Sequence, residues 1–591
     1  MKKFFGNIFT VVIGNVFTFL LVFFVLGAFA AMSMIGSLFQ SSGIKEGSVL
    51  ELSFNSQIKE STMDEEINLF SSQTTDTFYL SDILQSIHEA KTDDRIKGIS
   101  IKAESFYGGL TQLSDIRNAL LDFKESGKFI YAYSHNSGQS AYILSSVADS
   151  IFQNPLGTAM LQGLSTEVMF FKNFGDKYGI DFQVIRHGAY KSAVEPFMRD
   201  DLSPENKEQL DLLLKDIWNN LSEDVAKSRN IPLAQLNTYV DSLYSYNPSS
   251  ALKYNLIDAI YQEPEYDQFI LNKLGQTVKE DEKLQDIVDK YTVSLSKYTE
   301  NLKKQSSKDQ VAILYASGAI SQGDGYSGIQ SEVYKKAIRD IKNDKNIKAV
   351  VLRVNSPGGS ADASEEILYE LRELHKHKPI MVSFGDVAAS GGYYISMAAD
   401  SIFASPNTIT GSIGVLGMIP NAKKLVNNIG LTTDYVSTNE NANFLKTIFK
   451  PMSEHELKTM TEMTENIYRI FVNHVSEARN QTFEQVDSIG GGRVWSGTQA
   501  LKIGLIDRFG NLQDAVMAAA AKADLDDYSI TNYPIKEMGW KVILSEYGVN
   551  SKELKIQQEL GDEYFEIYQQ LKAIKEYNGI QLRMPFEFKI Q

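Results

Sequence analysis

The chain of 591 residues contains no cysteine. This absence excludes disulfide bonds, thiolate catalysis and metal sites built on cysteine. Histidine is scarce, with seven scattered residues, and the one close pair, His375 and His377, would point to different faces of a helix. We therefore expect no metal site.

Basic residues are in the minority. The 58 Lys and Arg residues face 74 Asp and Glu residues, which gives a net charge of −16. This charge argues against a protein that binds nucleic acid. The hydrophobic content of 43% is that of a globular protein, and the length requires two or more domains.

Charge is missing altogether between Lys3 and Lys45. The apolar run from Ile8 to Met34 is long enough to span a bilayer core of about 30 Å as a helix. Two lysines precede it, which predicts a single span with the body outside the cytoplasm. A cleaved signal peptide is the alternative, because Ala28-Phe29-Ala30 has the form of a cleavage site. We favour the uncleaved anchor, because apolar signal cores have only about 7–15 residues.

The sequence repeats itself over a long range. Ala148 to Phe152 recurs letter for letter as Ala399 to Phe403, 251 residues later. The segments Arg95 to Ile101 and Asn346 to Leu352 are similar at the same spacing. A constant offset over about fifty residues predicts one fold present twice.

Strands and helices alternate within each copy. In the second copy we expect strands over 310–315, 347–354, 379–384 and 401–404. Helices are expected over 331–343 and 362–375, the latter opened by Asp362 and Glu365 as a capping pair. This alternation predicts an α/β fold with a mainly parallel sheet and functional residues at the carboxyl ends of its strands.

We divide the chain into five parts. They are a membrane anchor (1–44), a first α/β repeat (45–265), a helical connector (266–308), a second α/β repeat (309–534) and a C-terminal helical tail (535–591).

Ser390 stands where an expected strand turns into an expected helix, directly before Gly391 and Gly392. This position exposes the hydroxyl at the positive end of a helix and offers the Gly391 N–H to an anion. A nucleophilic serine needs both features. For the motif alone, a serine that only caps a helix is the favoured interpretation, and the rest of the sequence has to overturn it. In the first copy Gln139 takes the equivalent position, and Ser140 is one place out of register. The first copy is therefore predicted to be degenerate.

A serine nucleophile needs a base. His187 lies in the degenerate copy and most other histidines lie in expected helices, so a Ser-His-Asp triad is a minor alternative. Lys191 lies in a small, apolar stretch after an expected strand, where burial would lower its pKa. Lys446 is the rival, because it precedes Pro451 as Lys191 precedes Pro196, although its neighbours are more polar.

Four motifs carry a resemblance to a known family. They are Tyr190 to Phe197, Asn355 to Ser360, Ala389 to Tyr394 and Thr410 to Gly414. Together they resemble the signal peptide peptidase A family in its long, duplicated form. The resemblance implies two tandem Clp/crotonase-like spiral α/β repeats behind an N-terminal transmembrane helix. It also implies a membrane-bound serine endopeptidase with a Ser/Lys dyad.

The resemblance assigns a role to each matched residue. Ser390 would be the nucleophile, Lys191 the general base, and Ser412 would orient the lysine. Gly359 and Gly391 would supply N–H groups to the oxyanion, with Gly358 as the fallback for the first.

The family also implies substrates and surroundings. The expected substrates are signal-peptide remnants and other apolar peptides held in extended form. The expected setting is a homotetramer in the bacterial inner membrane, with its catalytic body on the periplasmic side and with no cofactor. An inactive membrane scaffold and, less favoured, a crotonase-like acyl-CoA enzyme are the alternatives.

Overall fold

The computed structural model describes residues 44–54, 56–60, 78–302, 306–325, 327–535, 556 and 579–584. Within these ranges no helix is both long and apolar enough to cross a membrane. The expected anchor over 8–34 lies outside the described residues, as does most of the expected helical tail.

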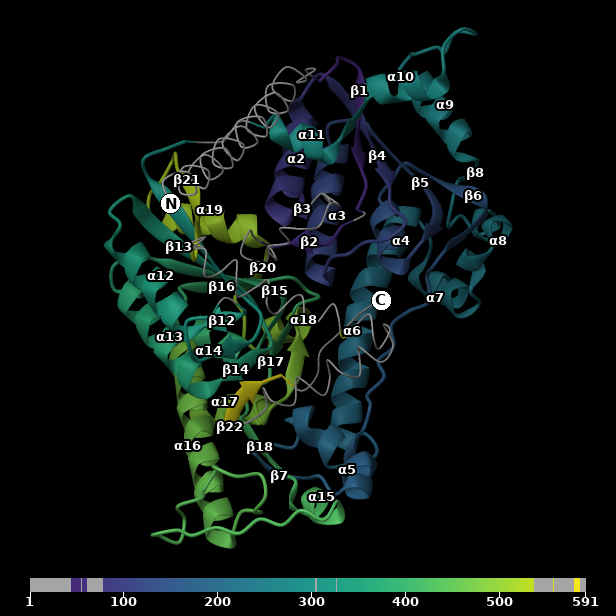
Figure 1. Cartoon of the computed structure of the whole chain (residues 1–591). Helices are drawn as coiled ribbons and strands as arrows, with labels where there is room; N and C mark the ends of the chain where they lie inside the picture. Colours follow the sequence, from purple (N-terminus) through teal and green to yellow (C-terminus); the bar gives the residue numbers. More distant parts are fainter. Residues whose placement is uncertain are drawn as a thin grey trace, which may run out of the picture.

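The first copy is built on a six-stranded sheet in the order β8-β6-β5-β4-β1-β9, and all its pairings are parallel (Figure 1). Its central strands carry the first core, with Leu50, Ile99 and Ile130 fully buried. The strands are β1 (Ser48–Leu52), β4 (Ile96–Lys102), β5 (Phe129–Ser137), β6 (Ser150–Ala159), β8 (Ala259–Ile260) and β9 (Thr292–Ser294). Its helices include α2 (Leu80–Thr92), α3 (Leu110–Lys124), α4 (Gln139–Ser145), α5 (Lys172–Tyr178) and α6 (Pro204–Arg229).

The second copy has an eight-stranded sheet with the main path β19-β17-β15-β13-β10-β21, extended by β16 and β20. Val350, Leu352 and Val382 are fully buried within or beside it. The strands are β10 (Gln310–Ser317), β13 (Ile347–Ser356), β15 (Ile380–Ala389), β16 (Ser401–Ala404), β17 (Ile409–Gly411), β19 (Val494–Ser496), β20 (Arg508–Phe509) and β21 (Ser529–Tyr533). Its helices include α12 (Ser331–Asn343), α13 (Ala361–His375), α14 (Gly391–Ile395), α15 (Lys423–Asn428), α16 (Glu454–Arg479) and α19 (Leu512–Lys522).

The helices of the two copies correspond closely. Helices α2 and α12 have 13 residues each, and α3 and α13 have 15 each. Both pairs lie 251 residues apart, at the offset that the sequence repeat predicts. The long helices α6 and α16 have 26 residues each, and in Figure 1 α16 lies at the lower left with α6 to its right.

A third sheet joins the copies, in the order β12-β11-β14-β22-β18-β7. Strand β7 comes from the first copy and pairs antiparallel with β18 of the second, from Arg186 opposite Leu416 to Asp181 opposite Asn421. The two lie together in the lower part of Figure 1. This pairing carries the chain that follows β7 into the second copy. The strands are β7 (Asp181–Arg186), β11 (Ile320–Ser321), β12 (Ile329–Gln330), β14 (Gly358–Ser360), β18 (Leu416–Asn421) and β22 (Gly579–Arg583).

Three local expectations need correction. Helix α13 is capped by the Ser360 hydroxyl, which accepts from the Ala363 N–H, and not by the expected pair at Asp362 and Glu365. The expected connector contains helices, but its strand β9 extends the first sheet beside β1, so this segment belongs to the first copy. The described end of the tail forms the strand β22, where we expected helix.

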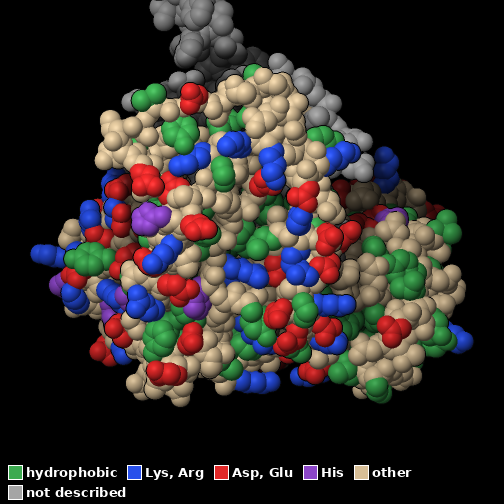
Figure 2. Space-filling model, turned by 90° about the horizontal axis from the view of Figure 1, so that it is seen from below, with side chains coloured by type: hydrophobic (Ala, Val, Ile, Leu, Met, Phe, Trp, Pro, Cys, Tyr) green, Lys and Arg blue, Asp and Glu red, His purple; other side chains and the backbone are tan. Residues whose placement is uncertain are grey.

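Charges of both signs are interspersed on the surface. Over the face in Figure 2, Lys and Arg side chains alternate with Asp and Glu, with no large patch of one sign. This face offers no basic surface for nucleic acid.

Candidate active site

Ser390 follows the last residue of β15, and helix α14 begins at Gly391. Its backbone has φ 55° and ψ −114°, outside the main allowed regions for a residue with a side chain. The turn is held because the Ser390 N–H donates to the Gly411 carbonyl at 2.8 Å. Strained backbone of this kind clusters at functional sites. Ser390 has 0% exposed surface.

Lys191 meets Ser390 from the first copy. Its Nζ lies 2.8 Å from the Ser390 Oγ and 3.0 Å from the Ser412 Oγ, and it donates to the Ser412 carbonyl at 3.1 Å. Lys191 is fully buried, and burial lowers the pKa of its ammonium well below the ordinary value. A lysine with a lowered pKa can act as a proton acceptor.

Glycines allow the close packing around Lys191. A Cβ atom added to Gly492 would lie 2.6 Å from the Lys191 Cβ, and one added to Gly414 would lie 3.2 Å from the Lys191 Cδ. Gly414 belongs to a motif singled out in the sequence, whereas Gly492 was missed. The run Gly490 to Gly492 was the available signal, since consecutive glycines mark close approach of backbone.

A buried network fixes the loop that carries Lys191. Directly after the lysine, a 3-10 helix runs over Ser192–Phe197. Its Glu195 is fully buried and accepts from the Ser203 Oγ at 2.6 Å and the Asn206 Nδ2 at 2.9 Å. The Ser192 Oγ donates to the Asn206 Oδ1. A buried network with its partners satisfied restrains the position of the adjoining backbone.

The glycine turn of β14 lies beside Ser390. A Cβ atom on Gly391 would lie 3.1 Å from the Gly359 N, so these two amides are neighbours. The Gly358 N–H already donates to the Ser356 Oγ at 3.1 Å. Gly359 and Gly391 are thus better placed than Gly358 to share one oxygen of a ligand.

The rival bases lie elsewhere. Lys446 is exposed, on the segment that follows α15. All seven histidines lie within the described residues, and no hydrogen bond joins any of them to Ser390. His187 is bonded to Glu465, and His474 to Glu365.

The first copy has no equivalent pair. The Gln139 Oε1 accepts from the N–H groups of Gln162 and Gly163, and its Nε2 donates to the Gly163 carbonyl. The Gln139 side chain is therefore hydrogen-bonded to the loop at Gln162 and Gly163, whereas the equivalent side chain in the second copy, Ser390, is hydrogen-bonded to Lys191. Among the described residues, no cluster of three or more acidic or histidine side chains could hold a metal ion.

A segment of the chain itself lies across the glycine turn. Strand β22 runs antiparallel to both β14 and β18, with Leu582 opposite Gly359 and Gln581 opposite Leu416. A Cβ atom on Gly358 would lie 2.0 Å from the Leu582 carbonyl oxygen and 2.6 Å from the Gly391 N. The Leu582 carbonyl thus lies next to the amides that flank Ser390, and its side chain is fully buried. No feature of the sequence had indicated this strand.

Comparison with known proteins adds two family matches. The family described as Peptidase family S49 matches residues 122–268 and again residues 372–526. The family described as Clp protease matches residues 302–410, which form the first part of the second α/β copy.

Individual relatives cover most of the chain. It is 36% identical over 465 residues to Protease 4 of Salmonella typhi, covering 77% of this chain and 74% of the relative. Protease 4 of Haemophilus influenzae is 35% identical over 448 residues, which cover 74% of this chain and 72% of the relative. The chloroplastic serine protease SPPA of Arabidopsis thaliana is 31% identical over 487 residues, or 82% and 70%.

Proposed function

Because this chain belongs to peptidase family S49 and is a serine peptidase, we propose that Ser390 is its nucleophile and Lys191 its general base. The observation that carries this proposal is the 2.8 Å approach of the Lys191 Nζ to the Ser390 Oγ in a fully buried setting.

The proposed reaction begins with neutral Lys191. As the Ser390 Oγ attacks the substrate carbonyl carbon, its proton passes to the Lys191 Nζ. The Ser412 carbonyl and hydroxyl hold that nitrogen in place. The C–N bond then breaks, and the lysine ammonium returns the proton to the leaving amine. Water then attacks the acyl-enzyme carbonyl carbon and gives its proton to Lys191. The bond from that carbon to the Ser390 Oγ breaks, the Oγ takes the proton back from the lysine ammonium, and the acid product leaves.

The negative oxygen of the tetrahedral intermediate needs donors. We assign this role to the N–H groups of Gly359 and Gly391, which are neighbours in space. The loss of one such donor costs about 3–4 kcal/mol of transition-state stabilisation in other enzymes.

Strand β22 supports an extended mode of substrate binding. It lies between β14 and β18, so a peptide that replaced it would pair with strand edges on both sides. A substrate carbonyl in the place of the Leu582 carbonyl would lie beside Gly391 and the nucleophile. The buried side chain of Leu582 supports an apolar residue at that position. We propose apolar peptides, signal-peptide remnants among them, as the substrates.

We further propose that the protein is anchored by residues 8–34 in the bacterial inner membrane, with its body on the periplasmic side. Limited digestion of spheroplasts tests this, because the added protease should reach the body. Protection of the body would contradict the proposal.

Exposed apolar side chains support self-association into the expected homotetramer. They gather on the segment after α15: Ile429, Leu431, Tyr435, Val436, Leu445 and Ile448. An apolar surface of this kind is typical of an interface. Light scattering of the detergent-solubilised protein gives the subunit number directly, and a monomer at working concentration would refute this part.

A serine-reactive phosphonate tests the chemistry. We expect it to modify the wild-type chain at Ser390 and to leave Ser390→Ala unmodified, with Ser140→Ala, in the degenerate copy, as a matched serine variant that keeps the dyad. An inactive scaffold or an acyl-CoA enzyme would show no modification at Ser390.

A further inference from the structure

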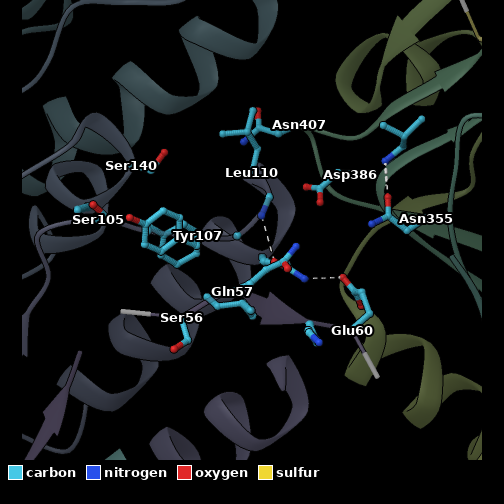
Figure 3. A pocket seen from close by; sticks show the side chains of 18 of the residues that line it. Ser56, Gln57, Glu60, Ser105, Tyr107, Leu110, Ser140, Asn355, Asp386 and Asn407 are labelled. Atoms are coloured by element: carbon cyan, nitrogen blue, oxygen red, sulfur yellow. Dashed lines mark hydrogen bonds between the residues drawn. The ribbon is translucent and has the colours of Figure 1, made fainter. Parts of the chain in front are cut away.

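A cavity of about 1190 Å³ lies between the two copies, away from the dyad. Figure 3 shows it from close by. The first copy contributes its turn around Gly108 and the start of α4 at Gln139 and Ser140. The second copy contributes Asn355 near the carboxyl end of β13, Asp386 in the second half of β15 and Ile409 at the start of β17. Pockets for small ligands have about 300–1,000 Å³, so this cavity has room for several residues of a peptide.

The cavity is the first copy's counterpart of the catalytic cleft, without the catalytic groups. Gln139 takes the place of the nucleophile, and its amide is tied to the loop at Gly163. The Gly109 N–H donates to the Gln112 Oε1, and the Thr111 N–H donates to the Asp386 carboxylate. Two amides of this turn are therefore occupied and the nucleophile is replaced by Gln139, so the counterpart site retains space to bind a chain but lacks the groups to cleave it.

The strand in the catalytic cleft is directed toward this cavity. Along β22 the partners step backward through β14: Gln581 lies opposite Ser360, Leu582 opposite Gly359 and Arg583 opposite Gly358. The Met584 N–H then donates to the Pro357 carbonyl at 2.7 Å. Two residues before Pro357 is Asn355, which lines the cavity. A peptide that follows this path reaches the cavity with the residues after Met584.

The end of the described strand and the cavity share one apolar cluster. Met584 is buried in the same hydrophobic cluster as Ile409, and Val387, Phe106 and Leu110 pack against that cluster. Four of these residues also line the cavity: Ile409, Val387, Phe106 and Leu110.

We propose that this cavity binds the part of an extended peptide substrate that lies on the carboxyl side of the cleaved bond. The inference rests on the proposed function, because it takes the Leu582 carbonyl as the marker for the bond that Ser390 attacks. The degenerate copy then contributes twice to one reaction, with a base and with a binding site for the leaving segment.

The lining also indicates which segments fit. Apolar side chains line the cavity together with the uncharged groups of Ser140 and Asn355, and Lys59, Glu60 and Asp386 add charges of both signs. Glu60 is paired with buried Arg353 at 3.0 Å, whereas the Asp386 carboxylate is bonded to Thr111. We therefore expect apolar and uncharged residues to be preferred over charged ones, which would lose their hydration in a largely apolar lining.

Two fluorogenic peptides provide the test with the full chain. Both carry the sequence of residues 577–584, and one continues for six apolar or uncharged residues at its carboxyl end. In wild type we expect the long peptide to have a kcat/KM about tenfold higher, mainly through a lower KM. Equal values for the two peptides would overturn the inference, while their hydrolysis would leave the proposed function intact.

Ser140→Trp adds bulk inside the cavity, and Ser140→Ala is the matched control without added bulk. We expect Ser140→Trp to remove the advantage of the long peptide and to leave the short peptide and phosphonate labelling of Ser390 unchanged. Retention of the advantage would overturn the inference. If the wild-type protein were neither labelled at Ser390 nor able to hydrolyse either peptide, the proposed function itself would be refuted.

A second measurement does not depend on that variant. The long peptide with a photo-reactive benzophenone at the fourth residue after the cleaved bond is bound to Ser390→Ala and irradiated. Attachment to residues that line the cavity, such as 56–60, 105–110, 138–141 or 386–387, supports the inference, and attachment only outside the lining contradicts it.

Discussion

Lys191 and Ser390 are 199 residues apart in the chain, yet their side chains meet at 2.8 Å. The pairing of β7 with β18 explains this, because it carries the end of a first-copy strand into the second copy just before Lys191. One site is thus built from two copies of a fold.

The rate of hydrolysis should rise with pH and then level off. Only neutral Lys191 can accept the proton, and burial lowers its pKa well below the ordinary value. The plateau should therefore begin below the pKa of about 10.4 of a free lysine. The pH profile of kcat/KM with a short peptide measures this. A profile that follows a group with a pKa near 6.5 in wild type and is unchanged in Lys191→Met would indicate a histidine base instead.

The burial of Lys191 should also lower the free energy of unfolding of the protein at neutral pH. The unfolded chain protonates this lysine below a pH of about 10.4, whereas the folded chain does so only below its lowered pKa. Unfolding is therefore favoured by protonation, and stability rises with pH between the two values. Urea unfolding at pH 7 and pH 9 should show Lys191→Met to be more stable than wild type at pH 7, with a weaker dependence on pH. Lower stability of the variant at pH 7 would show that the lysine's hydrogen bonds outweigh its desolvation.

Asp115 should give stability a dependence of the opposite sign. Burial raises the pKa of its carboxyl to about 7. The folded chain then keeps a proton that the unfolded chain loses near pH 4, so stability should fall as pH rises from about 4 to about 7. Asp115→Asn has the same shape and should remove this fall, so its advantage in melting temperature should grow with pH. Equal melting temperatures of Asp115→Asn and wild type at pH 7.5 would contradict the prediction.

Removal of residues 579–591 should increase activity on short peptides. Strand β22 lies across Gly358 and Gly359, so it competes with any substrate strand for the same edges. An enzyme whose open form is a minor population gains in apparent affinity when that form becomes dominant, here by about tenfold. Leu582→Asp should have the same effect, because it buries a carboxylate without a partner. Lower activity of both variants would mean that β22 supports the glycine turn.

Much of the fold could be predicted from local pattern. The apolar spacing predicted α12 at its observed bounds and α13 to within one residue, and the repeat predicted the matching helices of the first copy. The position of Ser390 between β15 and α14 was likewise visible in the sequence.

The remainder depends on contacts distant in the sequence. No local pattern shows that β7 would join the sheet of the other copy, or that β22 would lie between β14 and β18. The approach of Gly492 to Lys191 and the cavity between the copies arise from the same long-range packing. The apolar stretch around Lys191 and the family motif both favour Lys191 over Lys446, and the burial of Lys191 agrees with that preference.

The measurement that tests the shared site most directly is hydrolysis of a short apolar peptide by two lysine variants. Lys191→Met should lose about 10²–10⁴-fold in kcat, the range for a general base, while folding normally. Lys446→Met removes an exposed lysine and should retain most of the wild-type rate. The reverse pattern, with Lys446→Met inactive and Lys191→Met active, would contradict a dyad formed between the copies.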